Sequence, residues 1–407
     1  MKKIFKKMLK KIYKALPKKV TQFYKKARKH IMLRFVFPMT YKRSARGKEI
    51  QDKKVVFVEI RYKKIVSAYQ LVYDRLIAEG YDVHVQYIQN ISPNRWAYIG
   101  RCIEMLKDIS DAHYVFLNDG CNITSCVPMR KETVVFQLWH ACGAFKKFGM
   151  STADLIFGDN RKNQERYPNY RNITYVSVSS PEIIWAYREA MNLDGTDTQV
   201  IPAGVSRTDV FYDKDFIEDA KEQVYAVCPQ ARDKKIILYA PTFRGRVAKA
   251  KTPNCLDIPA MKEAFGDEYV LLLKHHPLVK KRPKVSEECQ DFAMDITKDL
   301  DIEQLLCVSD ICISDYSSLI FEYSLFERPM IFYAYDLDNY FDWRGFYYNY
   351  DELTPGPIVT STEEIIDYIQ NLDTHFDKAE VHAFREKFMS ACDGHATDRI
   401  VELVHNN

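Results

Sequence analysis

From about residue 54 onward, short apolar runs alternate with longer amphipathic stretches. The runs predict strands at residues 54–60, 81–88, 112–118, 133–139, 172–180 and 198–204, and, after a charged link near 213–234, at 236–242, 269–277, 292–297, 310–315 and 329–335. Helical patterns separate most of them, and one of these, over residues 65–79, ends at Gly80. This alternation is typical of parallel sheets in α/β proteins. Two successive sets of strands predict two Rossmann-like domains that face each other across a cleft.

The first 50 residues follow a different pattern. In residues 1–16, apolar side chains recur along one side of a predicted helix and lysines fill the other: Ile4, Phe5, Met8, Leu9, Ile12, Tyr13 and Leu16. Pro17 ends this helix, and a second basic amphipathic stretch follows. The 50 residues contain 18 lysines and arginines against one acid, a charge of +17, which leaves −13 for the rest of a chain with a net charge of +4.

We therefore divide the chain into a basic amphipathic segment (1–50) and two Rossmann-like domains (51–212 and 213–407), the second carrying the C-terminal helices. Lysine-rich amphipathic helices are typical of segments that lie on an anionic membrane surface. A solvated lysine tail and an RNA contact are the alternatives. The acidic body argues against a nucleic-acid partner. No apolar run is long enough to span a bilayer, and the N-terminus lacks the apolar core of a secretion signal.

Polar clusters follow several of the predicted strands, where open α/β sheets bind their ligands. His140 ends a buried strand close to Gly143 and is placed to accept a proton. Arg244 follows the first strand of the second domain, as a phosphate-binding arginine would. His275 and His276 are adjacent on an extended segment, so only one of them can face the cleft. A satisfied structural histidine and a solvated loop are the plainer interpretations of these clusters.

The fourth cluster lies at residues 310–335. Asp315 ends an apolar run, Ser317 and Ser318 follow, and a helical pattern that contains Glu322 leads to the next strand. A helix start of this kind offers free N–H groups and a favourable dipole to an anion, and a carboxylate one turn inside could hold a ribose. An ordinary βαβ unit with a serine N-cap is the alternative. The chain has no GxGxxG, Walker A or GxSxG sequence.

Together these clusters resemble the CDP-glycerol:glycerophosphate glycerophosphotransferases, which build wall teichoic acid and related polymers. The matching segments run in the family's order: QLWHACGAFKKFG (137–149), IPAGVSRTDVFY (201–212), ILYAPTFRG (237–245), LLLKHHP (271–277), ISDYSSLIFEYSLFERPMIFYAYDLDNY (313–340) and RGFYYNYDELTPGP (344–357). Many members read Trp-His-Gly-Thr where this chain reads Trp-His-Ala-Cys-Gly. That departure resembles the primase-like branch and leaves the acceptor open.

The resemblance implies a GT-B architecture, with an acceptor domain (51–212) and a CDP-donor domain (213–407), working at the cytoplasmic face of the membrane as a peripheral protein. It implies transfer of glycerol phosphate or ribitol phosphate from a CDP-alditol to a hydroxyl of a lipid-linked saccharide, with release of CMP. We expect no cofactor and no tightly bound metal. A nucleotide-sugar glycosyltransferase of cell-surface polysaccharide synthesis on the same fold and a non-catalytic membrane-bound scaffold are the alternatives.

The resemblance also assigns roles to residues. His140 corresponds to the proposed general base, and His276 to a second essential histidine. Arg244 corresponds to a phosphate-contacting arginine. Ser317 and Ser318, with Asp315 just before them, lie where the family holds the donor pyrophosphate, and Glu322 matches the acid near the cytidine ribose.

Overall fold

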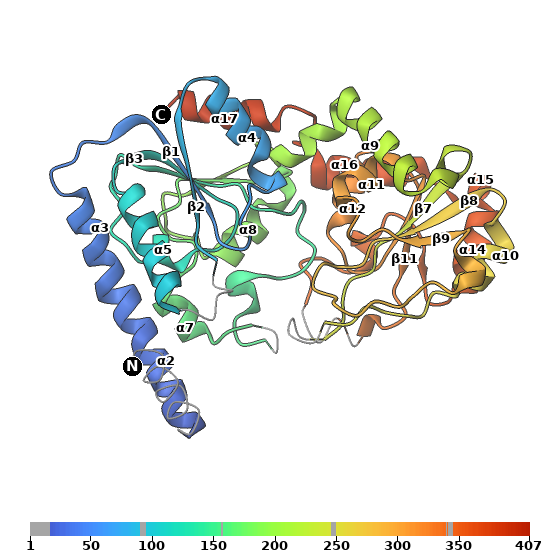
Figure 1. Ribbon diagram of the computed structural model, residues 1–407, viewed down its shortest axis with the longest axis horizontal. Coiled ribbons are helices and arrows are strands. Elements are labelled where there is room, and N and C mark those ends of the chain that lie inside the picture. Colours follow the sequence, from blue (N-terminus) through green and yellow to red (C-terminus); the bar gives the residue numbers. More distant parts are fainter. Residues whose placement is uncertain (1–16, 90–94, 156–157, 246–249, 339, 341–344) are drawn as a thin grey trace, which may run out of the picture.

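The computed structural model describes residues 17–89, 95–155, 158–245, 250–338, 340 and 345–407. Two six-stranded sheets form its two halves, and every strand pairing in them is parallel (Figure 1). The first sheet has the order β2-β1-β3-β4-β5-β6 and the second has the order β12-β11-β10-β7-β8-β9. The predicted α/β class with two parallel sheets is confirmed.

The strands of the first sheet are β1 (Gln51–Glu59), β2 (Asp82–Tyr87), β3 (Ala112–Leu117), β4 (Val134–Gln137), β5 (Tyr175–Ser177) and β6 (Gln199–Ile201). Those of the second are β7 (Lys235–Tyr239), β8 (Tyr269–Leu273), β9 (Ala293–Asp295), β10 (Ile311–Ser314), β11 (Met330–Tyr333) and β12 (Ile358–Val359). The principal helices of the first half and the junction are α4 (Ser67–Ala78), α5 (Arg95–Asp108), α6 (Asn122–Ser125), α7 (Arg161–Arg166), α8 (Ile184–Met191) and α9 (Lys214–Val227). Those that follow are α10 (Ile258–Phe265), α11 (Ile302–Val308), α12 (Leu319–Ser324), α14 (Thr362–Gln370), α15 (Leu372–His375), α16 (Lys378–Met389) and α17 (Ala396–His405).

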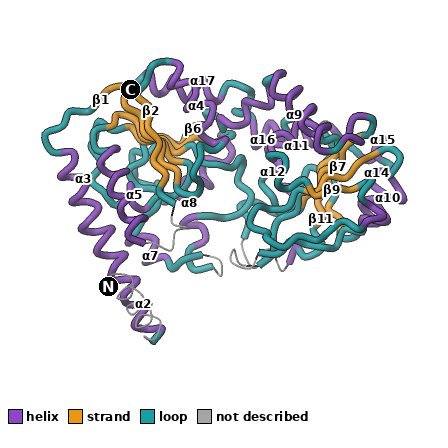
Figure 2. The backbone as a smooth tube through the Cα atoms, viewed as in Figure 1, coloured by secondary structure: helices purple, strands orange, loops and turns teal. Residues whose placement is uncertain are grey.

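Helices cover both faces of each sheet (Figure 2). In β1, Val55 and Phe57 pack with residues of α4 and α17, whereas Val56 and Val58 belong to the core on the other face, with residues of α5. Alternate residues of a strand point to opposite faces, so an apolar side chain at every position is what a sheet buried on both faces requires. This explains why the strands are continuous apolar runs in the sequence.

The charged link predicted near residues 213–234 contains a helix, α9, which is followed by a 3₁₀ turn. Phe216, Ile217, Ala220 and Val224 lie on one side of α9, and Ala220 and Val224 are buried in the shared core. This i, i+1, i+4, i+8 spacing is a helical apolar stripe that the many charges around it obscured. Strand β12 was not predicted, because two residues are too few for a periodic pattern.

The N-terminal part of the described chain is a continuous helical rod. It consists of α2 (Lys18–Ile31), the π-helical turn η1 (Met32–Val36) and α3 (Phe37–Ala45). Pro17 is the N-cap residue of α2. Figure 1 shows that α3 lies beside α5 and that α2 extends away from the first half. The amphipathic helix predicted over residues 1–16 lies outside the described residues.

The two halves are joined by a common core and by the C-terminus. One cluster of buried apolar residues includes Val56 of β1 and Leu238 of β7 and is therefore continuous between the sheets. The last helix, α17, returns to the first half beside α4, where the Tyr114 hydroxyl donates to the Val404 carbonyl at 2.8 Å (Figure 1). No helix within the described ranges is both long and apolar enough to cross a bilayer.

Candidate active site

The first part of the site lies where three neighbouring strands end. Glu59 ends β1, Asn118 follows β3 and His140 follows β4. The buried Glu59 carboxylate accepts hydrogen bonds from the Arg61 and Tyr62 backbone N–H groups, at 2.6 and 2.9 Å, and from the Asn118 side-chain amide at 2.9 Å. Because the side chain of Asn118 is fixed in this way, the backbone carbonyl oxygen of Asn118 is held in place 2.8 Å from Nδ1 of His140.

This contact decides which nitrogen of His140 can act as a base. A carbonyl oxygen only accepts hydrogen bonds, so Nδ1 must carry the proton, and the lone pair of the neutral ring lies on Nε2. Burial lowers the pKa of His140 from its ordinary value of 6.5, against the opposing effect of the nearby Asp119 carboxylate. His140 is therefore neutral at pH 7 and has Nε2 available to accept a proton.

The turn around His140 is held in an uncommon conformation. Trp139 has a φ of 59°, in the left-handed region that side chains other than glycine rarely occupy, and its ring lies 4.6 Å from the His140 ring. Gly143 has a φ of 61°; its N–H donates to the Ser179 hydroxyl at 3.0 Å and its carbonyl accepts from the Tyr187 hydroxyl at 3.2 Å. Strained backbone that its surroundings hold in place is common at functional sites.

The segment after His140 contacts the second half. The Lys147 N–H donates to the Gly345 carbonyl at 3.1 Å, and the Tyr347 N–H donates to the Phe145 carbonyl at 3.1 Å. Lys146 donates from Nζ to the Tyr340 hydroxyl at 3.0 Å. Residues that follow β4 are therefore fixed against residues that follow β11, which brings the two carboxyl edges into one region.

The second part of the site lies on β10, β7 and β8, which are neighbours in the second sheet. Asp315 follows β10, and its buried carboxylate accepts from the Thr242 N–H at 2.8 Å, the Thr242 hydroxyl at 2.6 Å and Nη1 of Arg244 at 2.9 Å. Arg244 also forms a bidentate pair with Asp336, at 2.6 Å from Nε and 2.8 Å from Nη2. The structure thus brings the predicted Arg244 and Asp315 into direct contact.

The Arg244 guanidinium is nearly saturated with these partners. Its Nη1 also donates to the Thr242 carbonyl at 2.8 Å, so the described contacts occupy four of its five N–H donors. The rings of Tyr316, Tyr340 and Tyr335 lie 5.0–5.7 Å from its central carbon. Such a guanidinium is held rigidly, and one N–H remains for a ligand.

The two adjacent histidines after β8 lie in different surroundings. His275 is buried, with Nδ1 2.9 Å from the Thr252 hydroxyl, whereas His276 is half-buried, with its ring centred 4.8 Å from that of Phe243. Nδ1 of His276 accepts the Leu278 N–H at 3.2 Å. A neutral ring that accepts at Nδ1 carries its proton on Nε2, so the tautomer of His276 is the opposite of that of His140.

The predicted phosphate-facing serines stand at the start of α12. Ser318 is the N-cap residue and Ser317 precedes it; both are half-buried, and the Ser317 hydroxyl is 3.4 Å from the Leu319 N–H. Glu322 lies one turn inside α12, as predicted, and its carboxylate forms an ion pair with Arg207. The second oxygen, Oε2, is buried and has no hydrogen-bond partner among the described residues.

A sequence model of one family covers almost the whole chain. The family is described as CDP-Glycerol:Poly(glycerophosphate) glycerophosphotransferase, and its model matches residues 40–406. The chain belongs to this family. It is accordingly a transferase, and the resemblance inferred from the six sequence segments is confirmed.

Relatives within this glycerophosphotransferase family match over most of their length. A teichoic acid ribitol-phosphate primase from Bacillus spizizenii is 33% identical over 376 residues, which cover 91% of this chain and 95% of the primase. A teichoic acid glycerol-phosphate primase from Bacillus subtilis is 30% identical over 349 residues, 80% of this chain and 85% of the primase. The wall teichoic acid polymerase TagF, in a variant soaked with CDPG, has the same fold, with a TM-score of 0.73, 24% identity and coverage of 95% and 98%.

Sequence reasoning missed three polar residues that organise the candidate site. Glu59 and Asn118 orient His140, and Arg207 joins Glu322 to Glu303 of α11, with Nη1 of Arg207 2.8 Å from Oε1 of Glu303. Asn118 ends the predicted strand 112–118 and Glu59 is the next-to-last residue of the predicted strand 54–60, so the strand-end rule that selected His140 also pointed to this region. Arg207 lies in a matching segment, IPAGVSRTDVFY, but no local pattern marks it as buried.

Proposed function

We propose that this glycerophosphotransferase moves an alditol phosphate from a CDP-alditol to a hydroxyl of a lipid-linked saccharide acceptor and releases CMP. In this proposal the two halves form a GT-B-like pair, with residues 51–212 as the acceptor domain, residues 213–407 as the CDP-donor domain and a cleft between them. The reaction takes place at the cytoplasmic face of the membrane, where the basic N-terminal segment holds the protein as a peripheral enzyme.

The observation that carries the proposal is the complementary state of the two histidines. The lone pair of Nε2 of His140 accepts the proton of the acceptor hydroxyl, which attacks the distal phosphorus of the donor. The N–H at Nε2 of His276 donates to an oxygen of the pyrophosphate. As the bond to the bridging oxygen breaks, the negative charge passes to the departing CMP, which fixed donors of the second half stabilise.

We assign the other predicted residues to donor binding. Ser317, Ser318 and the remaining N–H of Arg244 hold the pyrophosphate, and Asp315 and Asp336 keep Arg244 in place. Glu322 is the acid nearest the cytidine ribose in this proposal; its Oε2 has no hydrogen-bond partner among the described residues and is buried, so it meets the ribose only after donor binding exposes it. The names of the relatives favour ribitol phosphate as the first donor to test, with glycerol phosphate as the second.

Turnover assays with three donors test the proposal. The full chain is incubated with CDP-ribitol, CDP-glycerol or a UDP-sugar, together with a soluble acceptor analogue, and release of CMP or UDP is measured. Release of CMP that requires the acceptor supports the proposal. Release of UDP with sugar transfer would favour a glycosyltransferase instead, and CDP-alditol binding without release of CMP would indicate a scaffold. His140→Ala is the control for contaminating activity.

A further inference from the structure

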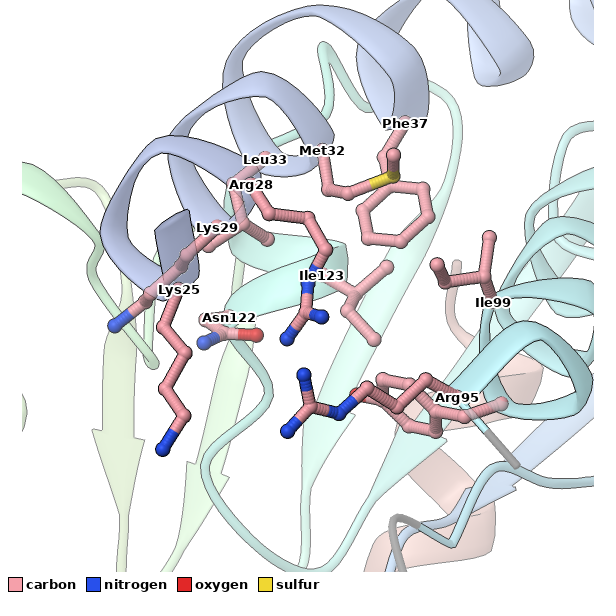
Figure 3. A pocket seen from close by; sticks show the side chains of 11 residues that line it. Lys25, Arg28, Lys29, Met32, Leu33, Phe37, Arg95, Ile99, Asn122 and Ile123 are labelled. Atoms are coloured by element: carbon pink, nitrogen blue, oxygen red, sulfur yellow. The ribbon is translucent and has the colours of Figure 1, made fainter. Parts of the chain in front are cut away.

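A pocket of about 650 Å³ lies between the N-terminal rod and the first half, and none of the catalytic or donor-binding residues assigned above lines it. Its walls come from α2, η1 and the start of α3 on one side and from α5 and α6 on the other (Figure 3). The volume is in the range of pockets that hold a small molecule. The pocket is therefore large enough for a bound ligand, and none of the catalytic or donor-binding roles proposed above uses it.

The lining has two chemically different parts. Lys25, Arg28 and Lys29 of α2 and Arg95 of α5 supply four cations, and the lining contains no acid. Figure 3 shows the guanidinium groups of Arg28 and Arg95 directed toward each other across the pocket. We find no carboxylate paired with either guanidinium within the described ranges. Two convergent guanidinium groups match the oxygens of a phosphate, to which arginine can donate in a bidentate manner.

The rest of the lining is apolar. Met32, Leu33, Phe37, Ile99 and Ile123 form a continuous wall beside the cationic groups (Figure 3). Leu33, Phe37 and Ile123 are buried at the base of this wall, and Met32 and Ile99 are its partly exposed members. A free phosphate or a nucleotide would leave Met32 and Ile99 without an apolar ligand group, whereas a lipid fills both parts, with the phosphate between the arginines and the first methylenes of its chain on the wall. Each methylene buried there increases affinity about fourfold.

Exposed aromatic side chains flank the pocket residues in the sequence. Phe23 and Tyr24, just before Lys25, are 70% and 58% exposed, and Trp96, just after Arg95, is 75% exposed. Tryptophan and tyrosine favour the boundary between lipid and water. Residues 1–16 of this chain are an unsuitable occupant, because their seven lysines and no acid would repel the four cations of the pocket.

We infer that this pocket binds the phosphate group of a membrane lipid together with the first methylenes of its chain. Its location suggests which lipid. Asn122, which lines the pocket, is four residues after Asn118, whose carbonyl orients His140, so their Cα atoms lie within about 14 Å of each other. This step rests on the proposed function: the occupant is the lipid that carries the saccharide acceptor. The acceptor hydroxyl then lies on the side of the pocket that faces His140.

Calorimetric titration of the full chain tests binding independently of transfer. The probes are decyl phosphate, hexyl phosphate, inorganic phosphate and the neutral decyl maltoside. We expect one site for decyl phosphate, weaker binding of hexyl phosphate, and little binding of the two probes that lack either the chain or the charge. Arg28→Gln/Arg95→Gln should weaken decyl phosphate at least tenfold. Ile99→Ser should reduce the difference between the two alkyl phosphates.

The matched control is Lys26→Gln/Lys42→Gln, which removes two exposed cations of the same rod outside the pocket. Equal losses in the two double variants would overturn the proposal, because the attraction would then come from the basic rod as a whole. Unchanged binding in Arg28→Gln/Arg95→Gln would overturn it as well. Thermal melting of each variant verifies that the rod remains folded.

A second measurement tests the assignment to the acceptor lipid. With a lipid-linked acceptor, kcat/KM should fall at least tenfold in Arg28→Gln/Arg95→Gln and remain unchanged in the control. With a water-soluble acceptor, both variants should match the unmodified protein. Equal rates on the lipid-linked acceptor would overturn the assignment. If the unmodified protein transfers to neither acceptor, the proposed function fails, while the titration still decides whether the pocket binds a lipid phosphate.

Discussion

Gly143 couples the turn that carries His140 to the second half, and adding one methyl group there tests that coupling. A Cβ at Gly143 would lie 2.3–2.4 Å from three ring atoms of Phe321 in α12, well inside van der Waals contact. Phe321 is fully buried, with the rings of Phe384 and Phe388 centred 5.3 and 5.4 Å away. The ring has little room to move, so either the turn or α12 must shift.

Two separate effects lower the free energy of unfolding of the Gly143→Ala variant. A left-handed φ costs a residue with a side chain about 1–2 kcal/mol, and overpacking a filled core costs about 1–3 kcal/mol, so we expect a loss of about 2–5 kcal/mol. Gly195→Ala is the matched control: Gly195 has a φ of 72°, but its added Cβ would meet nothing within 4 Å. The control should therefore lose only the conformational cost of about 1–2 kcal/mol.

Urea denaturation measures the free energy of unfolding of both variants, and the difference between them isolates the contact with Phe321. Turnover of the folded Gly143→Ala protein should also fall, because the same shift displaces the hydrogen bonds of Gly143 to Ser179 and Tyr187. Phe321→Leu should restore part of the loss when combined with Gly143→Ala. If Gly143→Ala proves as stable and as active as Gly195→Ala, the turn is not held against α12 and our argument for a rigid base is wrong.

His140→Ala should lower kcat by at least ~10²-fold with CDP-alditol binding retained. In the unmodified protein, the acid limb of the pH profile of kcat/KM should lie below pH 6.5, because the lowered pKa of His140 keeps the base unprotonated down to lower pH. An acid limb above pH 6.5 would contradict the assignment of His140 as the base. His276→Ala should raise the donor KM or lower kcat without loss of stability. His275→Ala should instead lower the free energy of unfolding, measured by urea denaturation, by about 1–3 kcal/mol and keep the turnover per folded molecule. The reverse pattern would exchange the roles of the two histidines. Arg207→Met should lower the free energy of unfolding by about 3–5 kcal/mol, because Glu303 and Glu322 lose their shared cation. Adding Glu322→Gln should recover part of this loss in the same urea denaturation assay. Unchanged stability of Arg207→Met would mean that these three charged side chains are solvated. Deleting residues 1–16 should weaken co-sedimentation with anionic vesicles at 0.15 M salt and preserve activity on a soluble acceptor; undiminished pelleting would place the membrane contact elsewhere.

The sequence was most informative where structure is periodic and local. Strand β8 is apolar throughout and β1 is apolar from Val55 to Val58 because both faces of each sheet are covered, and this pattern is visible without a structure. Helix α9 was hidden because its apolar stripe is short and surrounded by charged residues. The site residues found from sequence are those at strand ends, where topology alone brings side chains to one edge.

The residues that fix the states of the side chains proposed as catalytic could not be found in this way. The partner of Arg244, Asp336, lies 92 positions away, and Arg207 meets Glu322 115 positions away. The sequence marks Asp336 only as one acid of an Asp-Leu-Asp turn. Arg244 and Asp336 follow β7 and β11, two strands of one sheet, whereas Arg207 follows β6 of the first sheet and meets Glu322 in α12. In neither pair does a local sequence pattern identify the partner.

The division of labour between the two histidines depends on still less visible features. Both are histidines that follow buried strands, and nothing in their sequence surroundings separates a proton acceptor from a donor. Nδ1 of His140 meets a carbonyl that the buried Glu59 holds in place, whereas Nδ1 of His276 meets a backbone N–H two residues ahead. One backbone contact leaves a lone pair on Nε2 and the other leaves a proton there. The chemistry of each ring is thus set by backbone atoms, so replacing Glu59 with glutamine should disturb the base function of His140 without touching the ring itself.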